Sequence, residues 1–187
     1  ERVAARLGGL TTQVEEALGR LRGLEAAVVP EQASILVFSG DLDRLMAAFT
    51  VASGAAATGM KVQMFFTFWG SAALKRGGPQ PGGKTLVERM FGWMLPGGLH
   101  RRTLSKLDFA GAGRALMARE MRRKGISDLP ALIANAIEAG VQVFVCEMTL
   151  DMMGIRREEL IDYPGMSVCG VASFVEMAAN GHNCMFI

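Results

Sequence analysis

The chain has 187 residues, of which 50% are hydrophobic and 20% charged, with a formal net charge of +2 and three cysteines. This size predicts one large domain, alone or with an appended arm, and excludes a small domain that needs disulfide or metal staples. Three widely spaced cysteines without a CxxC pair, and a start without a recognisable secretory signal, exclude a disulfide framework and predict a reduced, cytoplasmic protein.

Residues 1–30 are predicted to form an amphipathic helical arm. One face of this helix is apolar and the opposite face is charged, and Pro30 ends the helical pattern. The arm is expected to pack on the domain or on a neighbouring subunit. Its apolar residues recur at helical steps of three and four: Val3, Leu7, Leu10, Val14, Leu18, Leu21 and Leu24.

The domain, 34–187, is predicted to begin with a βαβ unit. Apolar runs at 34–39 and 61–68 indicate buried strands, and the segment 42–58 between them indicates a helix that ends at Gly59. Unbroken apolar strands with a helical connection favour parallel pairing, with helices on both faces. Between residues 45 and 74 the only charged residue is Lys61, which raises the question of a membrane span. The segment 58–61 divides this region into two apolar stretches, each too short for the roughly 20 residues of a membrane-spanning helix. Contact with a membrane surface is therefore not favoured.

A third buried strand is predicted at 141–145, after a helix at 129–138. Cys146 follows this strand directly, so it lies at the edge where the carboxyl ends of parallel strands meet. Four residues at the tips of the first two strands are expected at the same edge, where α/β proteins bind ligands. These residues are Gly40, Asp41, Trp69 and Gly70.

The last part of the chain is predicted to form a turn at 163–165, a helix at 168–179 and a closing strand at 183–187, which places Cys184 in the core. Between the second strand and the helix at 129–138 lies a Gly/Pro-rich insertion at about 76–113. Residues 75–124 carry twelve Lys and Arg against three acidic residues, a net charge of +9, while the rest of the chain carries −7. This basic segment is either a solvated surface or a surface that attracts anionic partners.

Cys146 is the leading candidate for chemistry. A helix that starts directly after it would favour the thiolate, which is the nucleophile. The neighbouring carboxylate of Glu147 would oppose this unless it points away, and Met148 would supply an apolar surround. The plain alternative is that Cys146 is a small buried hydrophobic residue.

The other candidates each have a structural alternative. Cys169, before the helix, either resolves an oxidised or persulfidated Cys146 or packs in the core. Asp41 either binds a ligand group or caps its helix, with the cap favoured, and Trp69 either lines a pocket or packs. His182, Asn183 and Cys184 do not complete a zinc site, so no metal is expected. Because GxGxxG, GxxxxGK[ST] and GxSxG are all missing from the sequence, neither a nucleotide cofactor nor a serine hydrolase is expected. Nucleic acid is not an expected partner.

The combination of FSGDLD at 38–43, FFTFWG at 65–70 and CEMTLDMMG at 146–154 resembles the DsrE/DsrF-like sulfur-relay family, in its longer branch often labelled peroxiredoxin-like. The resemblance extends from residue 34 to the C-terminus and leaves out the arm. It implies a three-layer flavodoxin-like α/β fold, a homo-oligomer, and a sulfur-carrying cysteine at Cys146 that holds a persulfide or thiosulfonate. It also implies rhodanese-like or TusA-like sulfur carriers as partners. Small sulfur oxyanions are expected as ligands because the segment 75–124 is basic. The chain lacks the Thr-x-x-Cys pattern of a peroxidatic cysteine.

Three hypotheses therefore stand at the level of the sequence. In the first, the protein is a sulfur carrier or sulfurtransferase that uses Cys146. In the second, it is a non-catalytic homo-oligomeric binding or assembly module. In the third, it is a dithiol redox protein in which Cys146 and Cys169 have Cα atoms within about 7 Å of each other.

Overall fold

The computed structural model describes residues 13–20, 31–95, 97–99, 102–181 and 183–187. Residues 31–187 form one compact unit. Its elements in chain order are β1 (Gln32–Val37), α2 (Leu42–Ala57), β2 (Lys61–Phe66), α3 (Phe68–Ala73), α4 (Leu86–Met94), η2 (Phe109–Gly111), α5 (Ala112–Lys124), α6 (Leu129–Glu138), β3 (Gln142–Cys146), α7 (Glu147–Met153), η3 (Arg157–Glu159), β4 (Ser167–Cys169), α8 (Val171–Ala179) and β5 (Asn183–Phe186).

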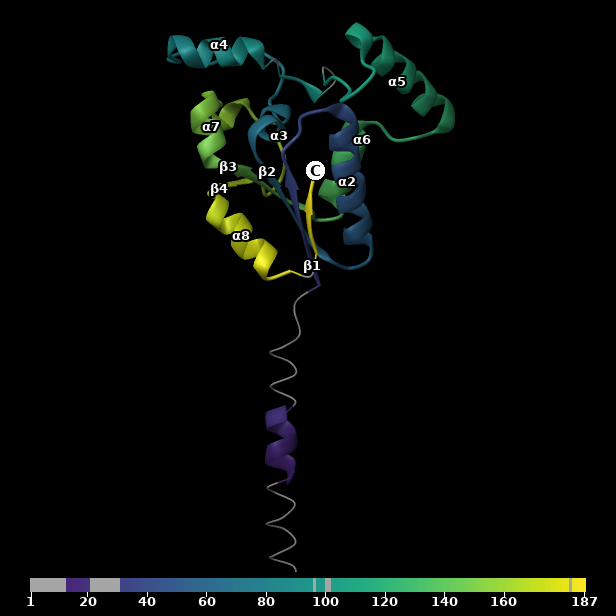
Figure 1. Cartoon of the computed structure of the whole chain (residues 1–187), viewed down its shortest axis with the longest axis vertical. Coiled ribbons are helices and arrows are strands. Elements are labelled where there is room, and N and C mark those ends of the chain that lie inside the picture. Colours follow the sequence, from purple (N-terminus) through teal and green to yellow (C-terminus); the bar gives the residue numbers. More distant parts are fainter. Residues whose placement is uncertain (1–12, 21–30, 96, 100–101, 182) are drawn as a thin grey trace, which may run out of the picture. The chain divides into compact units, whose positions relative to one another are not determined.

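The strands form a five-stranded sheet in the order β4-β3-β2-β1-β5, and every neighbouring pair is parallel. Figure 1 shows α2 and α6 on one face of the sheet and α7 and α8 on the other. Because both faces are covered, the central strands are mostly buried, and their carboxyl halves are apolar. The predicted three-layer α/β domain with a mostly parallel sheet is therefore confirmed.

The side chains of β3 are divided between two clusters of buried residues. Val143 and Val145 pack in the large core with the helices α2 and α6. Phe144 and Cys146 alternate with them and pack in a smaller cluster beside Phe174 of α8. Since successive strand residues point to opposite faces, the thiol of Cys146 lies on the α8 side of the sheet.

Three predictions need correction, two of element boundaries and one of burial. β2 ends at Phe66, and α3 follows from Phe68, so Trp69 and Gly70 lie in a helix and not in the tip of the strand. The segment Ser167–Cys169 is a strand, because it pairs with β3, and the helix predicted at 168–179 begins only at Val171. Cys184 is exposed and not in the core, because β5 is the end strand of the sheet.

The helices α4 and α5 lie beyond the carboxyl ends of the strands (Figure 1). The predicted irregular insertion at 76–113 thus contains an ordered helix. α4 begins at a capping box, in which the side chain of Thr85 accepts from the Glu88 N–H and the Glu88 side chain accepts from the Thr85 N–H.

Residues 1–30 form a second unit, of which the structure describes 13–20. These residues are helical, and Arg20 lies 3.2 Å from Glu16 across one helical turn. The remaining apolar positions of the predicted arm, such as Leu7 and Leu24, and the terminating Pro30 lie outside the described residues. Among the helices that are described, none has the length and apolar character needed to cross a bilayer.

Candidate functional site

Cys146 is the last residue of β3 and the N-cap of α7, as the sequence predicts. The strand ends here because the backbone turns directly into the helix Glu147–Met153. The side chain of Cys146 is only 1% exposed and packs with the rings of Phe65 and Phe174. The thiol therefore stands at the carboxyl edge of the sheet, covered by an aromatic layer.

The start of α7 is fixed to the end of β2. The hydroxyl of Thr149 lies 3.1 Å from the hydroxyl of Thr67 and accepts from the backbone N–H of Phe68 at 3.2 Å. Both threonines are buried. At its other end α7 stops at Gly154, whose left-handed conformation (φ +59°) and close contact with Glu88 leave no room for a Cβ. The backbone that carries Cys146 is thus held at both ends of α7.

Cys169 lies directly opposite Cys146. The two residues are Cα partners in the parallel register of β3 and β4, and Cys169 packs against the cluster that contains Cys146. Cys169 is half-buried, whereas Cys146 is buried. Burial raises the pKa of the Cys169 thiol, and Cys146 and Glu147 raise it further, against a hydrogen bond with Ser173 that lowers it.

The residues predicted at the tips of the first two strands lie at the same edge but pack with one another. A Cβ on Gly40 would lie 2.6 Å from the carbonyl oxygen of Trp69, and a Cβ on Gly70 would overlap the carbonyl of Val37. The two glycines therefore allow α3 to sit close against the end of β1. β2 separates β1 from β3, so Gly40 and Asp41 are two strands away from Cys146.

Asp41 occupies the predicted N-cap position of α2, but its side chain does not accept a capping hydrogen bond. Its carboxylate instead accepts from the hydroxyl of Ser39 at 2.9 Å, and Arg44 lies 3.8 Å away. The other predicted pocket residues, Trp69, Glu147 and Met148, are exposed, and Met148 is 59% exposed. Of the predicted site residues, the structure joins Cys146 to Cys169 and leaves the others along the rim.

A buried ionic cluster in and beside the insertion was not predicted. Nζ of Lys84 lies 2.5 Å from Oε2 of Glu159, and Nζ of Lys75 lies 3.9 Å from Oε1. The three side chains are each less than a tenth exposed. Burial raises the pKa of Glu159, but hydrogen bonds from the Arg156 N–H and Lys84 and the charges of both lysines lower it more, so the net pKa is below its usual value.

Lys75 has an unusual environment for a cation. Burial lowers its pKa, and the charges of Lys84 and Arg102 lower it further, against the charge of Glu159. Its ammonium donates to the carbonyl of Leu95 at 3.0 Å. The interpretation of the basic segment as only a solvated surface is therefore wrong for Lys75 and Lys84. Nothing in a Gly/Pro-rich sequence marks which lysines fold inward.

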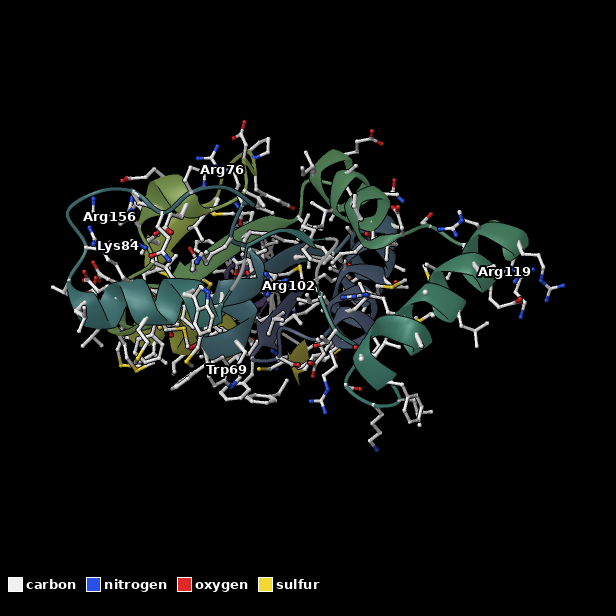
Figure 2. All side chains as sticks on the ribbon, turned by 90° about the horizontal axis from the view of Figure 1, so that it is seen from above. Trp69, Arg76, Lys84, Arg102, Arg119 and Arg156 are labelled. Carbon is white, nitrogen blue, oxygen red and sulfur yellow. The ribbon has the colours of Figure 1, made fainter. Side chains whose placement is uncertain are left out.

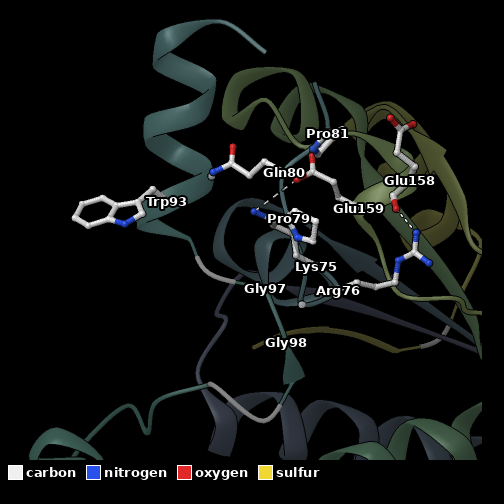
Figure 3. Close-up of a pocket in the computed structure, with 13 residues that line it drawn as sticks. Lys75, Arg76, Pro79, Gln80, Pro81, Trp93, Gly97, Gly98, Glu158 and Glu159 are labelled. Carbon is white, nitrogen blue, oxygen red and sulfur yellow. Dashed lines mark hydrogen bonds and ion pairs between the residues drawn. The ribbon is translucent and has the colours of Figure 1, made fainter. Parts of the chain in front are cut away.

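Lys75 and Glu159 of this cluster line a cavity of about 970 Å³. Figure 3 shows Lys75 reaching towards Glu159, Arg76 bonded to the carbonyl of Glu158, and Trp93 of α4 pointing away from them. The remaining wall is formed by the segments 77–81 and 97–98 and by Gly92. Neither this cavity nor a smaller one beside α5 is lined by a cysteine.

The basic residues of the segment 75–124 are spread over the carboxyl edge of the sheet. Seen from above the carboxyl edge in Figure 2, Arg76, Lys84 and Arg156 lie on the side of α4, Arg102 lies near the centre, and Arg119 lies on α5. The loop between them is attached to α2, because Asp43 accepts from the hydroxyl of Ser105 at 2.5 Å and from its N–H at 2.9 Å. Burial raises the pKa of Asp43, but these bonds hold it below its usual value.

Among the described residues there is no group of three His, Cys, Asp or Glu placed to hold a metal ion. His182, which the sequence analysis weighed as a ligand, lies outside the described residues, and so does His100.

Known proteins place the chain in a family. A sequence model of the DsrE/DsrF/DrsH-like family matches residues 30–186. The chain belongs to this family. It is 40% identical over 157 residues to the uncharacterized protein YrkE of Bacillus subtilis strain 168, covering 84% of this chain and 97% of YrkE. It is 32% identical over 166 residues to the sulfur carrier protein DsrE2 of Allochromatium vinosum, covering 82% of this chain and 96% of DsrE2.

Among solved structures, the chain is similar to the crystal structure of the ychN protein from E. coli. The sequence identity is 12% and the TM-score 0.46, over 83% of this chain and 99% of ychN. The resemblance to the DsrE/DsrF-like family that the sequence motifs carry is thus confirmed by the family match and by DsrE2.

Proposed function

We propose that this DsrE/DsrF/DrsH-like protein takes part in sulfur relay, and that it carries sulfane sulfur on Cys146 as a persulfide or thiosulfonate. The supporting observation is the position of Cys146 at the carboxyl tip of a central strand, in a chain that is 32% identical to a protein named as a sulfur carrier. Ligands and reactive groups collect at this edge in α/β folds.

The proposed chemistry is thiolate exchange. The Cys146 thiolate attacks the sulfane sulfur of a donor, the donor's sulfur bond breaks, and the rest of the donor leaves with the electron pair. With thiosulfate the leaving group is sulfite, and Cys146 becomes a persulfide. An acceptor thiolate then attacks the outer sulfur, and Cys146 returns as the thiolate. Sulfur is moved without a net change in its oxidation state, so no redox cofactor is needed.

One observation favours the second hypothesis, a non-catalytic assembly module. Cys146 is 1% exposed, so a bulky donor cannot touch its sulfur unless the covering elements move. A buried structural cysteine would look the same. Slow alkylation of Cys146 in the native protein, together with failure to take up sulfur, would move the assignment to this alternative.

The family also supports a proposal about partners and compartment. We infer a homo-oligomer that exchanges sulfur with rhodanese-like or TusA-like carriers in the cytoplasm. Three free cysteines support a reducing compartment. Small sulfur oxyanions are the proposed low-molecular-weight donors.

The test is intact-mass spectrometry of the native protein after incubation with thiosulfate, polysulfide or tetrathionate. Cys184 is exposed and would react with these reagents non-specifically, so the Cys184→Ser variant serves as the parent protein. The parent is expected to gain a reducible sulfur adduct that peptide mapping places on Cys146. Adding Cys146→Ser should abolish that adduct. A parent adduct that peptide mapping places on a residue other than Cys146 would overturn the assignment of the carrier to Cys146.

A further inference from the structure

The two neighbouring thiols, Cys146 and Cys169, differ in their access to solvent. The proposed carrier, Cys146, is enclosed by Phe65 and Phe174, and a sulfur carrier must meet its partners. The thiol beside it, Cys169, is partly exposed. We propose that Cys169 is the port through which sulfur enters and leaves, and that Cys146 is the position where it is stored. This inference rests on the proposed function of Cys146.

The strand register carries the geometric argument. Cys146 and Cys169 are paired positions in the parallel ladder of β3 and β4. Neighbouring strands lie about 4.8 Å apart, and paired residues point to the same face. This spacing falls within the roughly 4.4 to 6.8 Å between Cα atoms over which two cysteine sulfurs can bond. Both residues also belong to one side-chain cluster, on the α8 side of the sheet.

The position of β4 explains the difference in access. β4 is the end strand of the sheet and has only three residues, and in the described part of the chain no strand pairs with its outer edge. β3 lies between two strands, and Cys146 is also covered by the aromatic cluster. A partner that cannot reach Cys146 therefore still has an approach to the neighbouring thiol.

The transfer balances in two steps. With glutathione persulfide as donor, the Cys169 thiolate attacks the outer sulfur, the donor's S–S bond breaks, and glutathione thiolate leaves with the electron pair. The Cys146 thiolate then attacks the outer sulfur of the Cys169 persulfide. A new S–S bond forms on Cys146, and Cys169 leaves as thiolate and takes up a proton. The reverse sequence unloads Cys146 to an acceptor thiol.

The surroundings of Cys169 suit the protonation step. Burial raises the pKa of the Cys169 thiol, and the charges of Cys146 and Glu147 raise it further, against a hydrogen bond with Ser173 that lowers it. A thiolate that leaves from Cys169 is therefore readily protonated, which returns the port to its resting thiol.

The experiment compares the rate at which glutathione persulfide loads Cys146 in the parent Cys184→Ser protein with the rates in two further variants of that parent. Cys169→Ser should slow the loading of Cys146 by about tenfold or more. Cys146→Ser should leave sulfur on Cys169, where added glutathione removes it faster than it removes sulfur from the parent. Cys169→Ala and a melting curve for each variant separate loss of the thiol from loss of the fold.

The outcomes separate the two proposals. If Cys146 loads at the parent rate in both Cys169 variants, the port is overturned while the carrier stands. If no sulfur reaches Cys146 in the parent, the proposed function itself is overturned. If the parent instead loses two hydrogens and releases sulfide, Cys169 attacks the inner sulfur of the Cys146 persulfide, and the pair is a redox dithiol and not a port and store.

Discussion

The thiol pair and the lysine–glutamate cluster are two buried polar regions that lie on different parts of the fold. Cys146 and Cys169 are brought together by the hydrogen-bond ladder of two strands. Lys84 meets Glu159 only because the insertion folds back on the segment after α7. The first arrangement follows from regular structure, and the second depends on a contact between residues 75 positions apart. A ladder fixes reactive groups at little cost, whereas an ion pair must first be desolvated.

Removing one partner of the ion pair should have the largest effect. Glu159→Ala leaves two ammonium groups buried without their carboxylate, and breaking a buried pair costs about 3 to 5 kcal/mol. Thermal or urea unfolding measures this loss. The matched control is Glu158→Gln, because that neighbour is exposed and its 3.9 Å contact with Arg156 is worth about 1 kcal/mol or less. Similar losses in the two variants would contradict the distinction between the two glutamates.

Glycine packing at the carboxyl edge should give the next largest effect, without any change of charge. In Gly40→Ala the new Cβ would meet the Trp69 carbonyl at 2.6 Å, which forces the backbone apart at a cost of about 1 to 3 kcal/mol. Gly54→Ala is the control, since it lies inside α2 in open space and should stabilise by up to about 1 kcal/mol. Urea midpoints that move in the same direction for both variants would argue against the close contact.

Acid should weaken the ionic cluster. The pKa of Glu159 is lower in the folded protein than its ordinary value of 4.5, so its contribution to stability is present above pH 4.5 and is lost as the pH falls through the folded pKa. Unfolding free energies measured between pH 6 and pH 3 should fall less steeply in Glu159→Gln, once each curve is referred to its own value at pH 6. The difference between the two pH curves is the contribution of one carboxyl group. It amounts to about 1.4 kcal/mol of unfolding free energy for each unit by which folding lowers the pKa.

Raising the pH should increase the rate at which sulfur is loaded through Cys169. The pKa of Cys169 is raised above 9.0, first by burial and then by Cys146 and Glu147, so its thiolate is scarce near neutral pH. The rate of loading through Cys169 should therefore rise with pH and continue to rise beyond pH 9.0. Stopped-flow or quenched mass spectrometry of the Cys184→Ser protein provides the profile. Glu147→Gln removes one negative neighbour and should shift the profile towards lower pH.

The α/β architecture was predictable because the apolar runs and the glycine at position 59 mark a βαβ unit by themselves. The helix after Cys146 and the helix 129–138 were also predictable from local patterns. The three-residue strand β4 was not, because Ser167–Cys169 is too short to show a period and is a strand only through its pairing with β3. Because this pairing cannot be read from the local sequence, the close approach of Cys146 and Cys169 could not be predicted either.

The ionic cluster could not be predicted for a different reason. Lys75, Lys84 and Glu159 lie in three separate segments, and each has neighbours typical of a solvated loop. Only the folded chain decides which charges turn inward. Cys184 was mistaken for core because its strand is apolar in sequence, although an end strand leaves part of its side chains facing solvent.

The exposed thiol on β5 also affects how the protein must be handled. β5 ends the sheet, and its residues Cys184 and Phe186 are open to solvent. In air, two such exposed thiols from separate copies can oxidise to an intermolecular disulfide. A dimer band that appears on a non-reducing gel and is lost in Cys184→Ser therefore reports oxidation during purification. The native assembly state is measured on the serine variant or in the presence of a reductant.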